Sequence, residues 1–155
     1  MLARAPFSPR RRRRGAATVE FAVVVPVLLL FILGIIEIGR LIMVAQVNTN
    51  AAREAARYAA QGSGDAATVE TYTRNYLTAA GINGAAAGQN SAVTVTIEQQ
   101  ASGNWSAVTD PSGVPSGTPL RVTVSANFNQ QSWLPTRFFV GNNTPVQGVA
   151  VMRKE

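Results

Sequence analysis

The feature that most constrains this chain is a run of arginines followed by a long apolar segment. Residues 10–14 are all arginine, and Gly15 follows them directly. Residues 21–36 contain no charged or polar side chain, and the single acid between the two stretches is Glu20. A positive cluster before a long apolar stretch is typical of a membrane-targeting segment. The rest of the chain is therefore expected to fold at the end of a membrane helix.

The basic character of the chain is confined to its first residues. The net charge is +6, but six of the fourteen basic residues precede Gly15, and the other eight are balanced by eight acids. A nucleic-acid-binding domain needs a basic face with interleaved aromatic residues on its folded part. We therefore expect no nucleic-acid partner.

The composition also argues against catalysis. The chain contains neither cysteine nor histidine, so it lacks thiol chemistry and the commonest general base and metal ligand. No phosphate-binding glycine loop and no pair of carboxylates set by spacing occurs in it. We expect no enzymatic activity, no cofactor, no metal and no small-molecule substrate.

Residues 19–45 are long enough to cross a membrane, since a spanning helix needs about 20 mostly apolar residues. Basic residues precede this segment, and none occurs between Arg40 and Arg53. The positive-inside rule then places the N-terminus in the cytoplasm and the C-terminal part outside, as a single-pass protein.

Other membrane-directed segments begin in a similar way. A cleaved secretory signal has an apolar core of about 7–15 residues and a small-residue cleavage site, whereas this core is longer and no such site precedes Glu37. A twin-arginine export signal fits poorly with Ser8, Pro9 and the position of Phe21. A plain uncleaved signal anchor remains an alternative.

Gly15 and Glu20 indicate a more specific segment, a prepilin-type leader. Placing a charged residue at the centre of a membrane helix costs about 2.5–3.5 kcal/mol of insertion free energy, so such a residue indicates a function. Glu20 lies only one turn inside the apolar segment, where the cost is smaller but a functional role is still expected. Cleavage after Gly15 would expose a new ammonium on Ala16. Glu20 could pair with that ammonium or with the ammonium of a neighbouring subunit, near the positive end of the helix dipole.

Several short stretches together carry a family resemblance. They are residues 15–21 (GAATVEF), Pro26, residues 34–40 (GIIEIGR), residues 51–57 (AAREAAR) and the ending 150–155 (AVMRKE). Through these stretches the chain resembles the TadE-like family, whose members are minor pseudopilins of the tight-adherence (Flp-type) pilus system. The resemblance is dense over residues 15–60 and thin from 61 to 147.

The resemblance implies a protein of the bacterial inner membrane that takes part in pilus assembly, adhesion or secretion. It implies cleavage by a prepilin peptidase between Gly15 and Ala16, with Glu20 and Phe21 as assembly residues. Implied partners are that peptidase, other pilins or pseudopilins, the assembly platform and the lipid bilayer. Ala16 departs from the phenylalanine that type IV pilins typically carry at this position. The alternative is an unprocessed, signal-anchored adhesion or scaffold domain.

The helical pattern continues beyond the apolar segment and predicts one helix over residues 17–60. A mostly small-residue stripe lies on one face and a polar stripe on another. The first contains Val44, Asn48, Ala52, Ala55 and Ala59, and the second contains Gln46, Asn50, Arg53, Arg57 and Gln61. The glycines at 62 and 64 are expected to end this helix, whose second half would pack on the folded domain.

A second helix is predicted over residues 66–80, with Asp65 as its N-cap and Gly81 as its end. Its apolar face is expected to contain Val69, Tyr72, Tyr76 and Ala80. After Gly88 the period changes from 3.6 to 2, which indicates strands. These are expected at residues 93–97, 105–109, 120–128 and 146–152, with Trp133, Phe138 and Phe139 filling the core.

The expected fold class is α+β and pilin-like: a long membrane-spanning helix, a second helix and an antiparallel sheet of three to four strands. The expected divisions are a basic leader (1–15), a transmembrane and extended amphipathic helix (16–60) and an extracytoplasmic α+β domain (61–155).

Three further features remain open at this stage. Glu37 and Arg40 lie three residues apart, which predicts either an interfacial ion pair or a polar contact to another helix of an assembly. Pro26 is expected to kink the apolar helix. The loop around Trp133 is the only candidate for a ligand-binding module.

Overall fold

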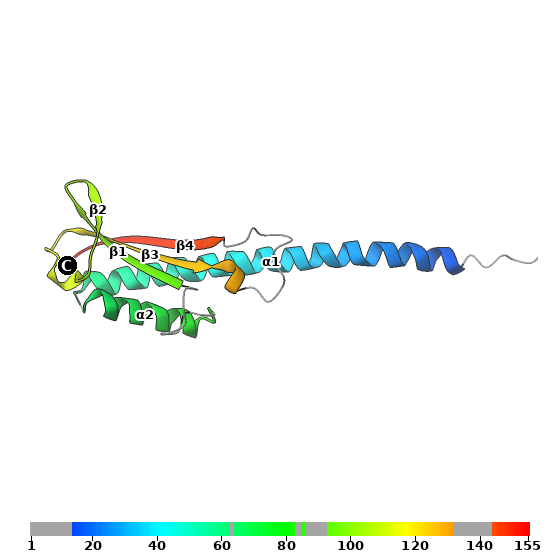
Figure 1. The fold of residues 1–155 in the computed structure, drawn as a ribbon, viewed down its shortest axis with the longest axis horizontal. Helices are drawn as coiled ribbons and strands as arrows, with labels where there is room; N and C mark the ends of the chain where they lie inside the picture. Colours follow the sequence, from blue (N-terminus) through cyan, green and yellow to red (C-terminus); the bar gives the residue numbers. More distant parts are fainter. Residues whose placement is uncertain (1–13, 63, 83–84, 86–92, 132–143) are drawn as a thin grey trace, which may run out of the picture. The chain divides into compact units, whose positions relative to one another are not determined.

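The computed structural model describes residues 14–62, 64–82, 85, 93–131 and 144–155. Its contacts divide the chain into two compact units, one ending at Ile36 and the other beginning at Glu37. Helix α1, Arg14–Ala60, is continuous and contributes to both units (Figure 1). Each unit is described by itself below.

The described part of the first unit consists of the N-terminal half of α1. The helix begins at Arg14, three residues before the predicted start at Ala17. Ala16 and Ala17 favour the helix, and Gly15 adopts helical conformation between them and Arg14. Pro26 lies inside α1.

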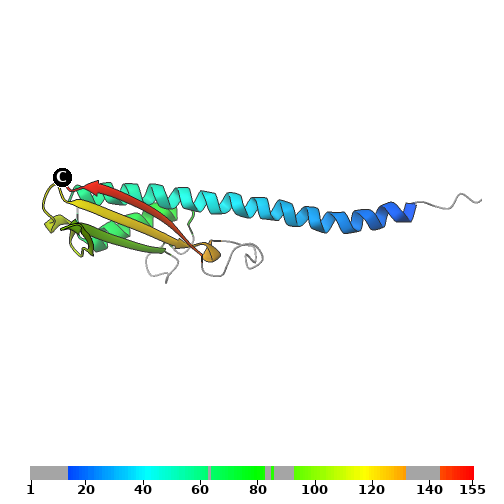
Figure 2. The ribbon, with the colours of Figure 1, turned by 90° about the horizontal axis from the view of Figure 1, so that it is seen from above.

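The second unit contains a four-stranded antiparallel sheet with the strand order β2-β1-β3-β4. The strands are β1 (Val93–Ala101), β2 (Asn104–Ala107), β3 (Pro119–Asn127) and β4 (Pro145–Arg153). The C-terminal half of α1 and helix α2, Ala66–Ala79, pack against one face of this sheet (Figure 2). The predicted α+β class is confirmed, with four strands.

The core lies between that face of the sheet and the two helices. Strand β3 shows the pattern most clearly, because every second residue from Leu120 to Ala126 is fully buried. The predicted small-residue stripe of α1 packs against it, and all five of its members are buried. Small side chains let helix and sheet approach closely, so the alanine stripe is the structural reason that α1 joins this unit. The polar stripe is exposed.

Helix α2 begins and ends as its capping residues predict. The Asp65 carboxylate accepts hydrogen bonds from the backbone N–H and the hydroxyl of Thr68 at 2.9 and 2.6 Å, and these bonds lower the pKa of Asp65. The hydroxyl of Thr68 makes the larger contribution. Gly81 follows with φ of 80°, a conformation that glycine adopts without strain.

The predicted buried face of α2 was partly wrong. The buried residues are Val69, Thr73 and Leu77, which are spaced four apart. Tyr76 is 38% exposed, and Tyr72 is half-buried because its ring stacks on Tyr58 with centroids 4.5 Å apart. The stripe at 69, 73 and 77 leaves Tyr76 and Ala80 on the solvent side.

The strands lie close to their predicted positions. Strands β1 and β2 form a hairpin whose two turn residues, Ser102 and Gly103, have φ of 52° and 86°. Two positive φ values characterise the type I′ turn, which suits the twist of a hairpin. Phe128, predicted to end the third strand, instead begins the short 3₁₀ helix η2, Phe128–Gln130, and is fully buried. The predictions for Trp133, Phe138 and Phe139 lie outside the described residues.

The end of the chain caps the end of α1. The carbonyl oxygen of Ala60 accepts hydrogen bonds from the Lys154 ammonium at 3.2 Å and from the backbone N–H of Glu155 at 3.0 Å. The last carbonyls of a helix have no partner within the helix, so these donors satisfy one of them. The C-terminal stretch singled out in the sequence thus contributes two donors to the end of α1.

Candidate functional site: helix α1

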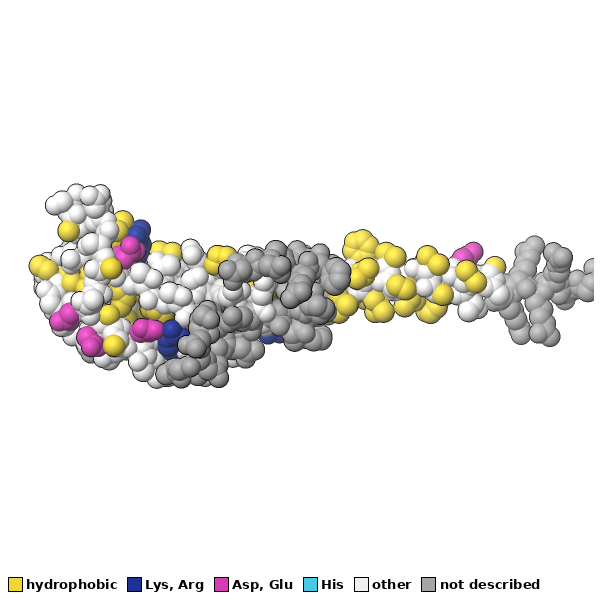
Figure 3. All heavy atoms as spheres, viewed as in Figure 1, with side chains coloured by type: hydrophobic (Ala, Val, Ile, Leu, Met, Phe, Trp, Pro, Cys, Tyr) yellow, Lys and Arg dark blue, Asp and Glu magenta, His cyan; other side chains and the backbone are white. Residues whose placement is uncertain are grey.

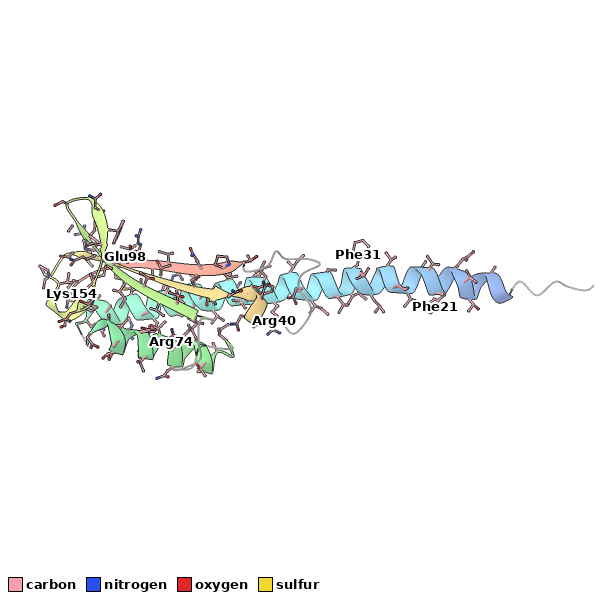
Figure 4. The ribbon with its side chains drawn as sticks, viewed as in Figure 1. Phe21, Phe31, Arg40, Arg74, Glu98 and Lys154 are labelled. Atoms are coloured by element: carbon pink, nitrogen blue, oxygen red, sulfur yellow. The ribbon has the colours of Figure 1, made fainter. Side chains whose placement is uncertain are left out.

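The N-terminal half of α1 presents apolar side chains on all sides. Figure 3 shows hydrophobic side chains on the visible face of this part of the helix, and Figure 4 shows Phe21 and Phe31 projecting from it. Both phenylalanines are 69% exposed. A helix that is apolar all around requires an apolar environment.

Length and composition allow this helix to cross a membrane. Among the described residues, α1 is the one helix that is long and apolar enough to cross a membrane. The uncharged residues 21–36 extend about 24 Å at 1.5 Å per residue, against roughly 30 Å for a bilayer core. These findings support single-pass membrane anchoring, as the sequence predicted.

Gly15 and Glu20, the two most specific residues of the sequence, both lie exposed on α1. A Cβ added to Gly15 would meet no atom within 4 Å. The helix itself therefore does not require glycine at this position. Ala16 and Glu20 are four residues apart, which places them on the same face of the helix. A new ammonium on Ala16 would thus lie one turn from the Glu20 carboxylate.

Glu37 and Arg40 do not form the ion pair that was one of their two predicted roles. Glu37 is only 2% exposed, and neither of its carboxylate oxygens has a hydrogen-bond partner in the described part of the chain. The Nε of Arg40 also has none. Residues i and i+3 differ by about 60° around a helix, and here Glu37 is buried whereas Arg40 (labelled in Figure 4) is half-exposed. The other predicted role, a polar contact to another helix, stays a prediction.

A second buried polar residue, Asn48, ties α1 to the last strand. Its side-chain amide donates a 2.8 Å hydrogen bond to the carbonyl oxygen of Val146. The strand can come this close because Gly148 has no side chain: an added Cβ would lie 2.3 Å from the carbonyl carbon and oxygen of Asn48. Sequence analysis placed Asn48 in the packing stripe but gave no signal for Gly148.

A charged cluster links α1 to α2. Arg57 forms two hydrogen bonds to the carboxylate of Glu54, and the hydroxyl of Tyr72 donates a third at 2.7 Å. These bonds lower the pKa of Glu54 from 4.5 to about 2, and hydrogen bonding to Arg57 makes the largest contribution. The cluster lies at the surface and holds α2 against α1 beside the Tyr58 ring.

In the described part of the molecule, no group of three acidic side chains could hold a metal ion. Two open hollows lie along the helices. One lies on the polar face of α1, lined by Ile42, Ala45, Gln46, Thr49, Asn50 and Arg53. The loop around Trp133, proposed above as a ligand site, lies outside the described residues.

Comparison with known proteins identifies this same helix. The family model described as TadE-like protein matches residues 15–57, so the match begins one residue after the start of α1 and ends three residues before its end. The resemblance inferred from the sequence is confirmed over this segment, and residues 58–155 lie outside the match. No curated protein and no solved structure matches the chain.

Proposed function

We propose that this protein is a pseudopilin-like structural component of a tight-adherence (Flp-type) pilus, matured by a prepilin peptidase that cleaves after Gly15. The observation that carries the proposal is the coincidence of the TadE-like match with α1. That helix combines an exposed apolar surface, Gly15 near its start and Glu20 as the one acid before Glu37.

The requirement for glycine at position 15 is external to the chain. Because an added Cβ would meet nothing, a larger residue would leave α1 itself undisturbed. A processing defect in such a variant would therefore come from the active site of the peptidase. This separates a processing role of Gly15 from a role in folding.

Glu20 acts after cleavage as the assembly residue. Its carboxylate lies among exposed apolar side chains, where an unpaired charge is unfavourable. The new ammonium of Ala16, on the same or a neighbouring subunit, compensates that charge. The pairing sets the register between helices, with Phe21 packing beside it.

The same proposal fixes location and partners. The protein is anchored in the bacterial inner membrane with its N-terminus in the cytoplasm, because the arginines of residues 10–14 precede the span. Its partners are the prepilin peptidase, other pilins or pseudopilins, the assembly platform and the bilayer. Its role in adhesion or secretion follows from the pilus to which it contributes.

The proposal is tested by comparing three variants in cells that contain the peptidase. Gly15→Leu should abolish processing, and Glu20→Ala should be processed but fail to support piliation. Gly39→Ala is the matched control, since an added Cβ there also meets nothing, and it should behave as wild type. Normal piliation in Glu20→Ala would remove the proposed role of Glu20. An unprocessed wild-type chain would favour the alternative, a signal-anchored adhesion or scaffold domain.

A further inference from the structure

The exposed apolar surface of α1 continues past the uncharged residues 21–36. Ile38, Ile42 and Met43 are exposed, and Met43 is the last large apolar side chain of α1 that is. Beyond Met43, every exposed position of the helix is polar. Arg40 is half-exposed and lies within the last apolar stretch. It is therefore a cation with exposed apolar side chains on both sides of it along the helix.

No acid in the described part of the chain neutralises Arg40. Glu37, the nearest acid in the sequence, is buried, and its carboxylate oxygens have no hydrogen-bond partner there. The Nε of Arg40 has none either, and the ion pairs among the described residues do not include Arg40. A charge among apolar groups is unfavourable unless it is paired and hydrogen-bonded. The guanidinium of Arg40 therefore requires an acceptor outside this chain.

The position of Arg40 in the sequence of α1 indicates which acceptor lies within reach. Residues 21–36 account for about 24 Å of helix, which is about 6 Å less than the hydrocarbon core of a bilayer. Arg40 follows Ile36 by four residues, or about 6 Å of helical rise. An arginine near the end of a membrane helix extends its guanidinium toward the interface. The anionic groups at that level are the phosphates of lipid headgroups.

We propose that Arg40 binds the phosphate group of a membrane phospholipid, while Ile38, Ile42 and Met43 contact the acyl chains beside it. The planar guanidinium can donate two parallel hydrogen bonds to phosphate oxygens. The contact marks the depth at which α1 leaves the membrane. This inference rests on the proposed function for the presence of the bilayer and for the orientation of the chain, which makes the leaflet the outer one of the inner membrane.

The first test measures carbon–phosphorus dipolar coupling in the full chain, labelled with ¹³C at the arginine Cζ atoms and reconstituted in bilayers of phosphatidylglycerol and phosphatidylcholine. Lipid phosphorus should dephase part of the Cζ signal, and Arg40→Gln should remove the share of one residue from that part. Arg53→Gln is the matched control, because Arg53 is an exposed arginine about 20 Å further along α1. It should leave the dephased signal intact. An equal dephased signal in wild type and Arg40→Gln would overturn the proposal.

The second test uses the wild-type chain in an uncharged detergent and distinguishes a lipid from free phosphate. The Nε–H resonance of Arg40 is assigned by its absence from the spectrum of Arg40→Gln. Short-chain phosphatidylglycerol should shift this resonance in a saturable manner, whereas inorganic phosphate at the same concentration should not. A shift with inorganic phosphate alone, or no shift with either compound, would contradict the proposal.

The lipid contact and the proposed processing can fail separately. The N-terminus is therefore sequenced in chains extracted from membranes with an active prepilin peptidase and used for the dipolar measurement. A start at Ala16 without a phosphorus contact at Arg40 would refute only the lipid site. A start at Met1 with that contact would refute the processing and leave the lipid site standing.

Discussion

The side-chain amide of Asn48 donates a 2.8 Å hydrogen bond to the carbonyl oxygen of Val146, 98 residues further along the chain. Two residues later, Gly148 lies directly against the Asn48 backbone. This contact joins the helix that carries the TadE-like match to the last strand of the sheet. An added side chain at position 148 would therefore meet the backbone of α1.

Gly148→Ala should destabilise the folded unit by about 3 kcal/mol, the upper part of the usual range for overpacking. The added Cβ would lie 2.3 Å from backbone atoms that cannot move independently. Urea unfolding of the full chain in detergent, followed by tryptophan fluorescence, measures the change. Gly39→Ala is the control and should not lose stability; an equally stable Gly148→Ala would show that β4 does not contact α1 here.

Asn48→Asp should be more destabilising than Asn48→Ala. Alanine removes one hydrogen bond, a loss of about 1 kcal/mol. Aspartate replaces a donor with an acceptor beside the Val146 carbonyl and places a charge at a fully buried position. The same unfolding measurement ranks the variants at neutral pH. If the Asp variant is as stable as the Ala variant, the Asn48 side chain does not donate a hydrogen bond to the Val146 carbonyl.

Glu37→Leu should raise the thermal unfolding temperature. The wild-type carboxylate is buried without a hydrogen-bond partner in the described part of the chain, and an apolar side chain removes that desolvation cost. Scanning calorimetry in detergent checks the direction, with an increase of about 1 kcal/mol in stability as the expected minimum. A variant that is more stable but forms no pili would indicate that Glu37 contacts another helix of the assembly. A less stable variant would contradict the finding that the Glu37 carboxylate lacks a hydrogen-bond partner.

Acid should weaken the folded unit through Glu54. Its pKa is lowered from 4.5 to about 2, so its stabilising contribution is complete above pH 4.5 and is lost as the pH falls toward 2. A pair at the surface contributes about 1 kcal/mol at most. Urea midpoints of wild type and Glu54→Gln should therefore differ at pH 6 and converge near pH 2. A constant difference across this range would exclude the predicted titration.

Local patterns predicted the elements of the fold well. The alternation from Leu120 to Ala126 identified β3, the alanine stripe identified the buried face of α1, and Asp65 with Gly81 marked the ends of α2. Each of these signals depends on neighbours in sequence. Tyr76 shows the limit of such signals, because aromatic character suggested burial while the stripe through Val69 and Leu77 decided the orientation of α2.

The features that were not predicted depend on contacts between distant residues. Nothing near Gly148 in the sequence indicates that Asn48 lies beneath it, and nothing near Lys154 indicates that it caps Ala60. The burial of Glu37 is of the same kind, because its sequence neighbours suggested a partner in Arg40. The edge position of β4 also required the strand order, which no local pattern gives.

The central claim is that the chain is processed between Gly15 and Ala16. Intact mass and N-terminal sequencing of protein extracted from membranes with an active prepilin peptidase test it directly. The account predicts a mature chain that begins at Ala16 in wild type and an unprocessed chain in Gly15→Leu. A wild-type chain that still carries its arginine-rich leader in such membranes would contradict it.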